Sequence, residues 1–253
     1  MQRGLPRVRM KGIYMNLFID LHIHTNASAH AYSSVYEHIM EAKRKNMLVL
    51  GITDHGPALN DSPHRWHFLN MDTIPKWFDG LRILKGIEAN IFENGKIDCD
   101  EIMAEKLDYV MAGFHTPVYP PNSDAVKNTE CLIKVINHPA VKIIVHPGNP
   151  QFPLDYKEIA IEACRNNVAL EVNSGSIDAR KGSAENCRKI IQEVMNAGGF
   201  FSVGSDSHFC TRTGDLDYAI NLLGEQHVPA EKIINSSLAL TLSFLDIEEM
   251  LRW

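Results

Sequence analysis

The sequence predicts one α/β domain in which parallel strands alternate with helices and close into a TIM-like barrel. Seven short apolar runs rich in β-branched residues indicate strands, at about 17–22, 48–53, 83–88, 109–114, 142–146, 168–172 and 200–205. Helical patterns lie between them at 34–45, 100–106, 129–137, 156–166, 185–197 and 216–223. Because about seven βα units fit one domain of this length, a (β/α)7 barrel is favoured over an open sheet.

Local signals support the ends of several elements. Ser33 or Ser34 followed by Glu37 is typical of a capping box that opens the first helix. Gly198 and Gly199 close a later helix before the last strand. The Asn-Gly pair within 91–97 predicts a small hairpin. The tail from residue 229 to 253 is expected to form a short helix and then a longer one, packing as a cap.

Two segments fall outside the repeating pattern. Residues 1–15 contain cationic side chains but no long apolar core, so they do not form a signal peptide. We expect a disordered extension there, with Met15 as a candidate natural start, and a single catalytic domain over 16–253. The segment 56–70 is rich in Pro, His and Trp, which predicts a functional loop or lid.

Composition narrows the function classes. The chain has 253 residues, 45% of them hydrophobic and 22% charged, which is ordinary for a globular protein. Its net charge of −6 argues against nucleic acid as the main partner. Five cysteines without a Cys-x-x-Cys pair indicate reduced thiols, and no apolar run is long enough to cross a membrane. These features predict a cytoplasmic protein.

Histidines and acids follow six of the seven predicted strands. His22 and His24 lie two apart at the end of the first strand, so both imidazoles point to one side. The other strand ends carry His55, Glu88, His115, His146, and Asp206 with His208. Because the carboxyl ends of barrel strands meet on one face, these residues are expected to converge. Each of them alone is more often structural, but the joint pattern predicts a metal site.

The same segments resemble the PHP (polymerase and histidinol phosphatase) family, and most closely its YcdX-type phosphatases, from Leu17 onward. The resemblance is carried by Asp20-Leu21-His22-Ile23-His24-Thr25, His30-Ala31-Tyr32-Ser33, Ile52-Thr53-Asp54-His55-Gly56-Pro57, Gly86-Ile87-Glu88-Ala89-Asn90, Ala112-Gly113-Phe114-His115, His146-Pro147-Gly148-Asn149-Pro150, Arg180-Lys181-Gly182-Ser183 and Gly204-Ser205-Asp206-Ser207-His208. It implies a distorted (β/α)7 barrel with three divalent metal ions, typically Zn²⁺, with Mn²⁺ or Fe²⁺ as alternatives.

The resemblance also implies a division of ligands. A first ion would be held by His22, His24, Glu88 and Asp206, a second by Glu88, His115 and His146, and a third by His30, His55 and His208. The residue types agree with this division, because imidazole and carboxylate suit zinc and its neighbours. The absence of thiolate ligands argues against a closed structural zinc site.

These ligands predict hydrolysis of small-molecule phosphomonoesters. Clustered divalent ions generate a metal-bridging hydroxide and clamp phosphate oxygens. Asp206 is the expected partner for proton exchange with that water, and Glu88 bridges two ions, so both are predicted as catalytic residues. Asp20 and Asp54 are expected to orient imidazoles, although a turn role for Asp20 is an equal alternative.

Weaker substrate-binding candidates lie in two loops. Arg180 and Lys181 follow the sixth strand and are predicted to hold phosphate, with solvated loop charges as the alternative. His64 and His67, in segment 56–70, are predicted to line the entrance beside Trp66, unless this is an ordinary packed loop. The remaining histidines, His38, His138 and His227, are expected to be surface or structural residues.

Two other functions stay open at the sequence level. A phosphodiesterase or exonuclease acting on nucleic-acid ends fits the family resemblance, but the acidic charge counts against it. A catalytically silent metal-binding module is the second alternative, and the complete ligand set argues against it. The substrate, the resident metal and the oligomeric state do not follow from the sequence.

Overall fold

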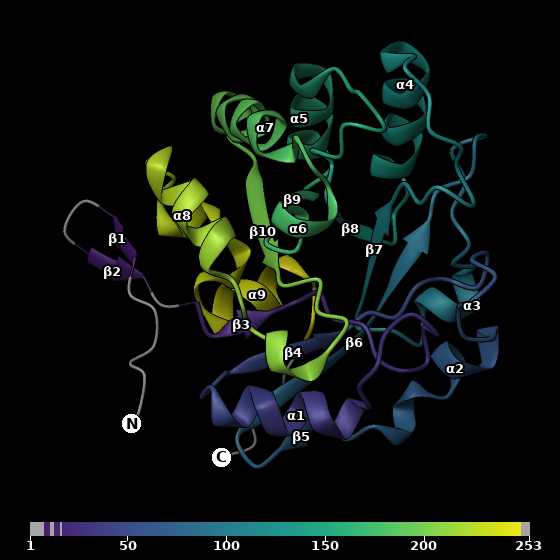
Figure 1. The fold of residues 1–253 in the computed structure, drawn as a ribbon, viewed down its shortest axis with the longest axis vertical. Coiled ribbons are helices and arrows are strands. Elements are labelled where there is room, and N and C mark those ends of the chain that lie inside the picture. The colour runs from purple at the N-terminus through teal and green to yellow at the C-terminus, as the bar shows by residue number, and fades with distance from the viewer. Residues whose placement is uncertain (1–7, 11–12, 16, 249–253) are drawn as a thin grey trace.

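A computed structural model of the chain describes residues 8–10, 13–15 and 17–248. Seven parallel strands in this part of the chain form a nearly closed barrel (Figure 1): β3 (Ile19–Asp20), β4 (Val49–Ile52), β6 (Leu81–Asn90), β7 (Tyr109–Gly113), β8 (Val141–Ile144), β9 (Ala169–Asn173) and β10 (Phe200–Gly204). They pair in this order, and a parallel bridge between Ile23 and Ser207 links the two ends of the sheet. The predicted (β/α)7 barrel is confirmed.

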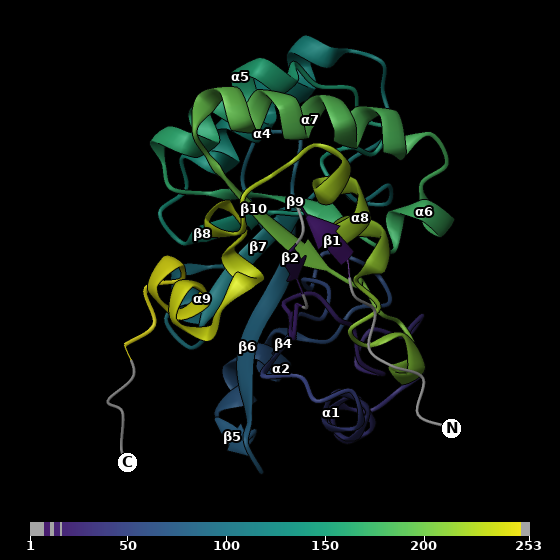
Figure 2. The same cartoon turned by 90° about the vertical axis from the view of Figure 1, so that its left-hand side faces the viewer.

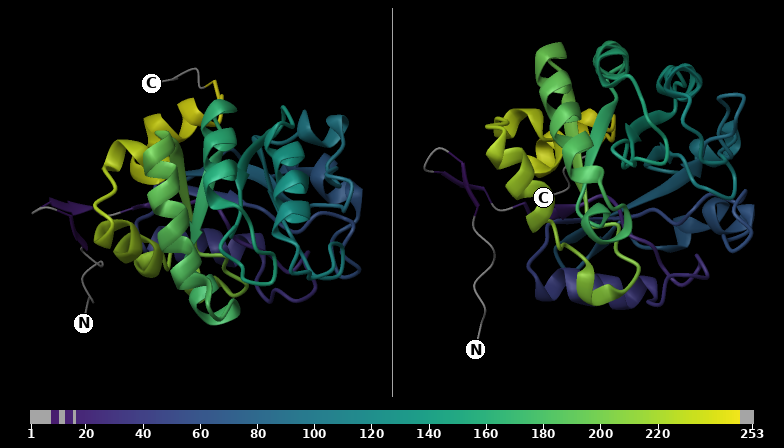
Figure 3. Two further views of the ribbon diagram at one scale, coloured as in Figure 1. Left: turned by 90° about the horizontal axis from the view of Figure 1, so that it is seen from above. Right: turned by 45° about the horizontal axis from the view of Figure 1, so that its top comes forward.

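Six of the helices surrounding the barrel correspond to the predicted ones: α1 (Val35–Arg44), α3 (Glu101–Ala104), α4 (Ala125–Ile136), α5 (Tyr156–Arg165), α7 (Ser183–Ala197) and α8 (Asp217–Glu225). Helix α4 begins before the predicted start because the Asp124 carboxylate accepts a hydrogen bond from the Lys127 backbone N–H. Seen from the side, α5 and α7 cover one flank of the strands and α1 the opposite flank (Figure 2). Two further views show α4, α5 and α7 side by side (Figure 3).

Shorter elements fill the connections: α2 (Arg65–Leu69), η1 (Met71–Thr73), β5 (Trp77–Phe78), α6 (Ser176–Ala179) and η2 (Cys210–Arg212). Segment 56–70, expected to have little regular structure, thus contains helix α2. The tail forms two 3-10 turns, η3 (Ala230–Lys232) and η4 (Ile234–Ser236), and then helix α9 (Leu238–Phe244). Residues 249–253 of the predicted tail helix lie outside the described residues.

Residues 1–15 are described only in part. Val8–Met10 (β1) and Ile13–Met15 (β2) pair as antiparallel strands, where the sequence had predicted disorder. The remaining positions of the predicted extension lie outside the described residues. The disorder of the extension as a whole therefore stays a prediction.

Three local predictions hold in the structure. The capping box uses Ser34, whose backbone N–H donates to the Glu37 carboxylate while its hydroxyl accepts from the Glu37 N–H. Gly198 ends α7 at φ 80°, a left-handed conformation that favours glycine. The Asn-Gly hairpin forms, with Ile91 bridged to Ile97 in antiparallel fashion.

Side chains alternate between the two faces of the strands. On β7, for example, Tyr109 and Met111 point into the barrel, whereas Val110 and Ala112 pack outward against the helices. Leu242 and Phe244 of α9 belong to the apolar cluster inside the barrel, so the tail packs as a cap on the barrel, as predicted. The interior near the carboxyl ends of the strands is lined instead by polar residues, and this is where the candidate site lies.

No helix within the described ranges has the length and apolar character needed to span a lipid bilayer.

Candidate metal centre

The nine predicted metal ligands come together at the carboxyl ends of the strands. We call them the ligand cluster: His22, His24, His30, His55, Glu88, His115, His146, Asp206 and His208. Six strands contribute, because each of these side chains lies near the carboxyl end of a strand or in the loop that follows it. The two residues at sharp strand exits, His146 and Asp206, have φ of 34° and 54°. Such conformations are uncommon for residues other than glycine and are held in place by their surroundings.

Glu88 is at the centre of the ligand cluster. Its Oε1 lies 3.0 Å from His115 Nε2 and 2.8 Å from His146 Nε2. Its Oε2 lies 2.8 Å from His55 Nδ1 and 3.3 Å from His24 Nε2. One buried carboxylate therefore faces imidazoles from four other segments, which is the arrangement that a bridging ligand requires.

The first predicted site is compact. His22 Nε2 and His24 Nε2 lie 3.1 Å apart, and Asp206 Oδ1 lies 3.2 Å from His24 Nε2. Asp206 Oδ1 is 3.6 Å from His22 Nε2, and Glu88 Oε1 is 3.5 Å from the same nitrogen. The four side chains assigned to one ion by the family resemblance thus point toward a common region.

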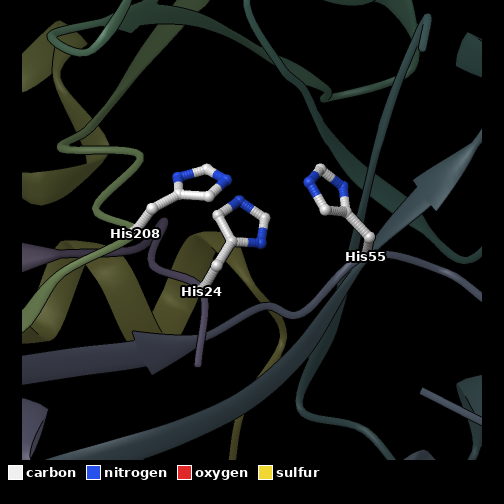
Figure 4. A group of neighbouring side chains, drawn as sticks. All are labelled: His24, His55 and His208. Carbon is white, nitrogen blue, oxygen red and sulfur yellow. The ribbon is translucent and has the colours of Figure 1, made fainter. Parts of the chain in front are cut away.

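The third predicted site lies toward the solvent. His30 Nε2 and His55 Nε2 are 3.2 Å apart, and the rings of His30 and His208 stack with centroids 4.9 Å apart. His24 also approaches this group, with its ring centroid 4.4 Å from that of His208. Figure 4 shows His24, His55 and His208 converging from three separate segments.

The chemistry of the donor set fits divalent cations. Three groups of potential ligands have their atoms within 4.8 Å of one another: His24, His55 and His208; His22, His24 and Glu88; and His55, Glu88 and His115. The buried atoms His24 Nδ1 and Glu88 Oε2 have no hydrogen-bond partner. Since buried polar atoms are normally paired, nitrogens and oxygens gathered in this way fit a divalent cation better than a hydrogen-bonded core.

The two acidic ligands are ionised in their surroundings. Although burial disfavours the charge of Glu88, nearby imidazoles, that of His115 above all, hold its pKa well below the usual range. Burial also opposes the charge of Asp206, but His22 and the Arg180 guanidinium hold its pKa well below the usual range. Both carboxylates are therefore charged at neutral pH, as metal binding requires.

Burial favours the neutral form of four ligand imidazoles by lowering the pKa of His24, His115, His146 and His208. Burial lowers the pKa of His24 well below its ordinary value and lowers that of His146 to about 4. His55 and His22 differ. At His55, Glu88 outweighs burial and raises the pKa, and at His22, Glu171 and Glu88 raise it well above the ordinary value. A cation at this position would compete with the proton on His22, so metal binding would release that proton.

The groups that orient the imidazoles differ from the predicted ones. Asp20 accepts hydrogen bonds from Ser205 and from the backbone N–H groups of His22 and Gly214, and it touches no imidazole of the ligand cluster. Its turn-type role is therefore the one that the structure shows. The prediction for Asp54 is also wrong for the ligand cluster, because its carboxylate binds Thr25 and Ser28 and faces His67 instead.

Three residues that the sequence analysis did not assign take over this orienting role. Glu171 Oε1 lies 2.8 Å from His22 Nδ1, Asn90 Oδ1 lies 2.7 Å from His115 Nδ1, and Asp61 Oδ2 lies 2.6 Å from His30 Nδ1. A signal for Glu171 was present, since it is the only charged residue of the otherwise apolar or amide-bearing strand β9.

The predicted substrate-binding residues have different surroundings. Arg180 donates from Nη1 to Asp206 Oδ2 at 3.0 Å, so it lies at the edge of the ligand cluster. His67 Nε2 lies 3.3 Å from Asp54 Oδ2. His64 accepts a hydrogen bond from the Trp66 N–H and caps helix α2, while Lys181 is exposed next to Arg180. Substrate binding by these four residues stays a prediction.

His38 has a structural role and provides a pH-dependence test. It is buried on α1, and its Nδ1 lies 2.7 Å from Thr213 Oγ1. Burial lowers the pKa of His38 from 6.5 to about 4, so the folded protein binds this proton less well than the unfolded chain. The stabilisation that results is complete above pH 6.5 and is lost as the pH falls toward 4.

We therefore expect the free energy of unfolding to fall by about 3 kcal/mol more between pH 7 and pH 4 in the wild type than in a His38→Gln variant. Urea denaturation at a series of pH values measures this difference. The exposed His227→Gln is the control and should follow the wild type. Identical pH profiles for His38→Gln and the wild type would contradict the expectation.

Comparison with known proteins agrees with the geometry. A family model described as the PHP domain matches residues 20–238, which include every member of the ligand cluster. The chain belongs to the PHP family. A PHP relative from Proteus mirabilis, named a probable phosphatase, is 48% identical over 229 residues, covering 90% of this chain and 93% of the relative. A second, from Tolumonas auensis and also named a probable phosphatase, is 46% identical and covers 92% of this chain and 95% of the relative.

The PHP fold also has a solved counterpart. The crystal structure of a histidinol phosphate phosphatase from Lactococcus lactis, in complex with zinc, L-histidinol and phosphate, superposes with a TM-score of 0.59. It covers 83% of this chain and 93% of its own, at 15% sequence identity. At this identity the likeness shows the shared fold.

Proposed function

We propose that this PHP protein is a metal-dependent phosphatase that hydrolyses phosphomonoesters of small molecules at a centre of three divalent ions, with Zn²⁺ as the leading candidate and Mn²⁺ or Fe²⁺ as alternatives. The observation that carries the proposal is the position of Glu88, whose two oxygens face imidazoles from four separate segments. The names of the relatives from P. mirabilis and T. auensis support the same activity.

The proposed ligands divide as the family resemblance implies. His22, His24, Glu88 and Asp206 would hold one ion; Glu88, His115 and His146 a second; and His30, His55 and His208 a third. When bound, such ions would lower the pKa of a water molecule and would stabilise the charge on the transferring phosphoryl group. The clustered short contacts in each set support the division.

Two residues near the first ion carry out the remaining chemistry in this proposal. Asp206 is ionised, so its carboxylate can accept a proton from the attacking water and pass it to the ester oxygen, which leaves as the alcohol when its bond to phosphorus breaks. Arg180 lies against Asp206 and presents a planar guanidinium, which suits a phosphate oxygen in the same region. Hydrolysis then yields an alcohol and inorganic phosphate.

Further parts of the proposal concern partners and compartment. The substrate is a phosphorylated small molecule rather than nucleic acid, in line with the net charge of −6. We also place the protein in the cytoplasm, which is supported by five cysteines that are all free in the structure.

Metal removal tests the proposed activity. We expect the purified protein to hold close to three divalent ions per chain by elemental analysis and to release phosphate from p-nitrophenyl phosphate. Treatment with a chelator should abolish hydrolysis, and adding Zn²⁺, Mn²⁺ or Fe²⁺ should restore it. A phosphodiester, bis(p-nitrophenyl) phosphate, serves as the comparison substrate and should be hydrolysed far more slowly.

Two outcomes would contradict the proposal. A metal-free protein that stays inactive after each of the three ions is added would exclude a metal-dependent phosphatase. Faster turnover of the diester than of the monoester would favour a phosphodiesterase instead.

A further inference from the structure

We infer that Glu171, on strand β9, is a positioning residue that joins two of the proposed ion sites and sets the metal affinity of both. The inference rests on the proposed function, because it takes His22 and His146 as metal ligands. Strand β9 contributes no side chain to the ligand cluster, and Glu171 contacts the cluster at His22 Nδ1 and at the His146 backbone N–H. Its effect on metal binding is indirect, through the His22 ring and the backbone turn at His146.

Glu171 occupies an interior position of the barrel. Side chains alternate along β9, so that Leu170 and Val172 pack outward while Ala169 belongs to the interior cluster. Glu171 shares the face of Ala169 and is only 1% exposed. A buried carboxylate is costly unless its oxygens are paired, so its partners explain why it is there.

One oxygen of Glu171 fixes the ring of His22. Oε1 lies 2.8 Å from His22 Nδ1, so this ring nitrogen donates and the opposite nitrogen, Nε2, is the one turned toward the ligand cluster to bind a cation. Nε2 is the atom that lies 3.1 Å from His24 Nε2. A carboxylate behind a ligand imidazole also makes that imidazole a stronger donor to a cation.

The other oxygen holds the turn that carries His146. Oε2 accepts a hydrogen bond from the backbone N–H of His146 at 2.9 Å. The φ of His146 is 34°, a backbone conformation that is uncommon for residues other than glycine. This turn directs His146 Nε2 to within 2.8 Å of Glu88 Oε1. Asn173 Nδ2 donates to the same oxygen of Glu171 at 3.0 Å and completes its hydrogen bonding.

The neighbouring strand β10 leaves room for this contact. A methyl group added at Gly204 would lie 2.4 Å from Glu171 Oε1 and 2.4 Å from the Cβ of His22. Any larger residue at this position would therefore push the carboxylate and the imidazole out of place. Glycine at 204 is required by the pairing of Glu171 with His22.

Substitution by glutamine tests the inference with little change in shape. A glutamine has one oxygen and one NH₂ group, so it cannot accept from both His22 Nδ1–H and the His146 N–H at once. We expect Glu171→Gln to weaken Zn²⁺ binding by 10- to 100-fold in chelator-competition titrations. The loss should affect more than one ion per chain, whereas the melting temperature of the metal-free protein should change little.

A matched control and a second variant make the result decisive. Glu231→Gln makes the same chemical change on the exposed turn η3 and should bind Zn²⁺ like the wild type. If Glu171→Gln does not fold, Glu171→Asp keeps the charge but shortens its reach and should also lose affinity. Wild-type Zn²⁺ affinity in the Glu171 variant that folds would overturn the inference.

The wild type separates this inference from the proposed function. If the wild type binds no divalent ion and hydrolyses no monoester, the proposed function fails. If the wild type does both while the Glu171 variant binds Zn²⁺ equally well, only the positioning role of Glu171 fails.

Discussion

Replacing Glu88 with glutamine is expected to lower kcat for p-nitrophenyl phosphate by about 10³-fold or more, in the range seen when a central catalytic group is removed. Glu88 Oε1 faces the imidazoles of His115, His146 and His22, and Oε2 faces those of His55 and His24. A neutral amide has one acceptor oxygen and no charge, so it can neither bridge two cations nor offset their repulsion. Steady-state kinetics and elemental analysis of the same preparations measure the effect.

The Glu88→Gln variant should also differ from the wild type in metal content. We expect Glu88→Gln to hold fewer ions per chain than the wild type, since Glu88 is shared by two proposed sites. The control is Glu231→Gln, which has the same chemistry on an exposed turn and should keep full activity. Normal activity in Glu88→Gln would remove the central assumption of the proposed mechanism.

Asp206→Asn is expected to lower kcat by about 10²- to 10⁴-fold, the usual contribution of a group that exchanges a proton in the transition state. The side chain is both a proposed ligand, with Oδ1 3.2 Å from His24 Nε2, and the proposed proton acceptor. An asparagine would also place its NH₂ or its oxygen against Arg180 Nη1, which donates to Oδ2 in the wild type. The variant therefore disturbs charge, ligation and proton transfer together.

The dependence of kcat on pH tests the proposed ionisation state of Asp206. Because the pKa of Asp206 is held well below its usual range, wild-type activity should show no inflection from this group near neutral pH. The exposed Asp217→Asn, at the start of α8, is the matched control and should match the wild type. An Asp206→Asn enzyme with wild-type kcat would assign proton transfer to another residue.

The barrel could be predicted because its signals are local. Each strand is a short apolar run and most of the helices have a clear apolar face, and these patterns survive in any tertiary context. Helix α2 was not predicted, because its five residues are too few to show periodicity and its cap is the unusual residue His64. Helix α4 begins at Ala125, ahead of the predicted start at residue 129, because the Asp124 carboxylate caps it.

The sequence by itself determined which candidate residues gather at one face of the barrel. His22, Glu88 and Asp206 lie near strand ends, and barrel topology brings such positions to one face whatever the details of packing. Positions relative to strands are therefore enough to predict which side chains, remote from one another in sequence, come together at the candidate site.

Only the tertiary structure decided which groups hold those ligands in place. Asp20 and Asp54 neighbour ligand histidines in the sequence, yet their carboxylates turn to backbone and hydroxyl donors. Glu171 lies 149 positions from His22 and meets its Nδ1 across the barrel interior. Orientation depends on distances of a few tenths of an ångström between side chains of different strands, and no one-dimensional pattern encodes such distances.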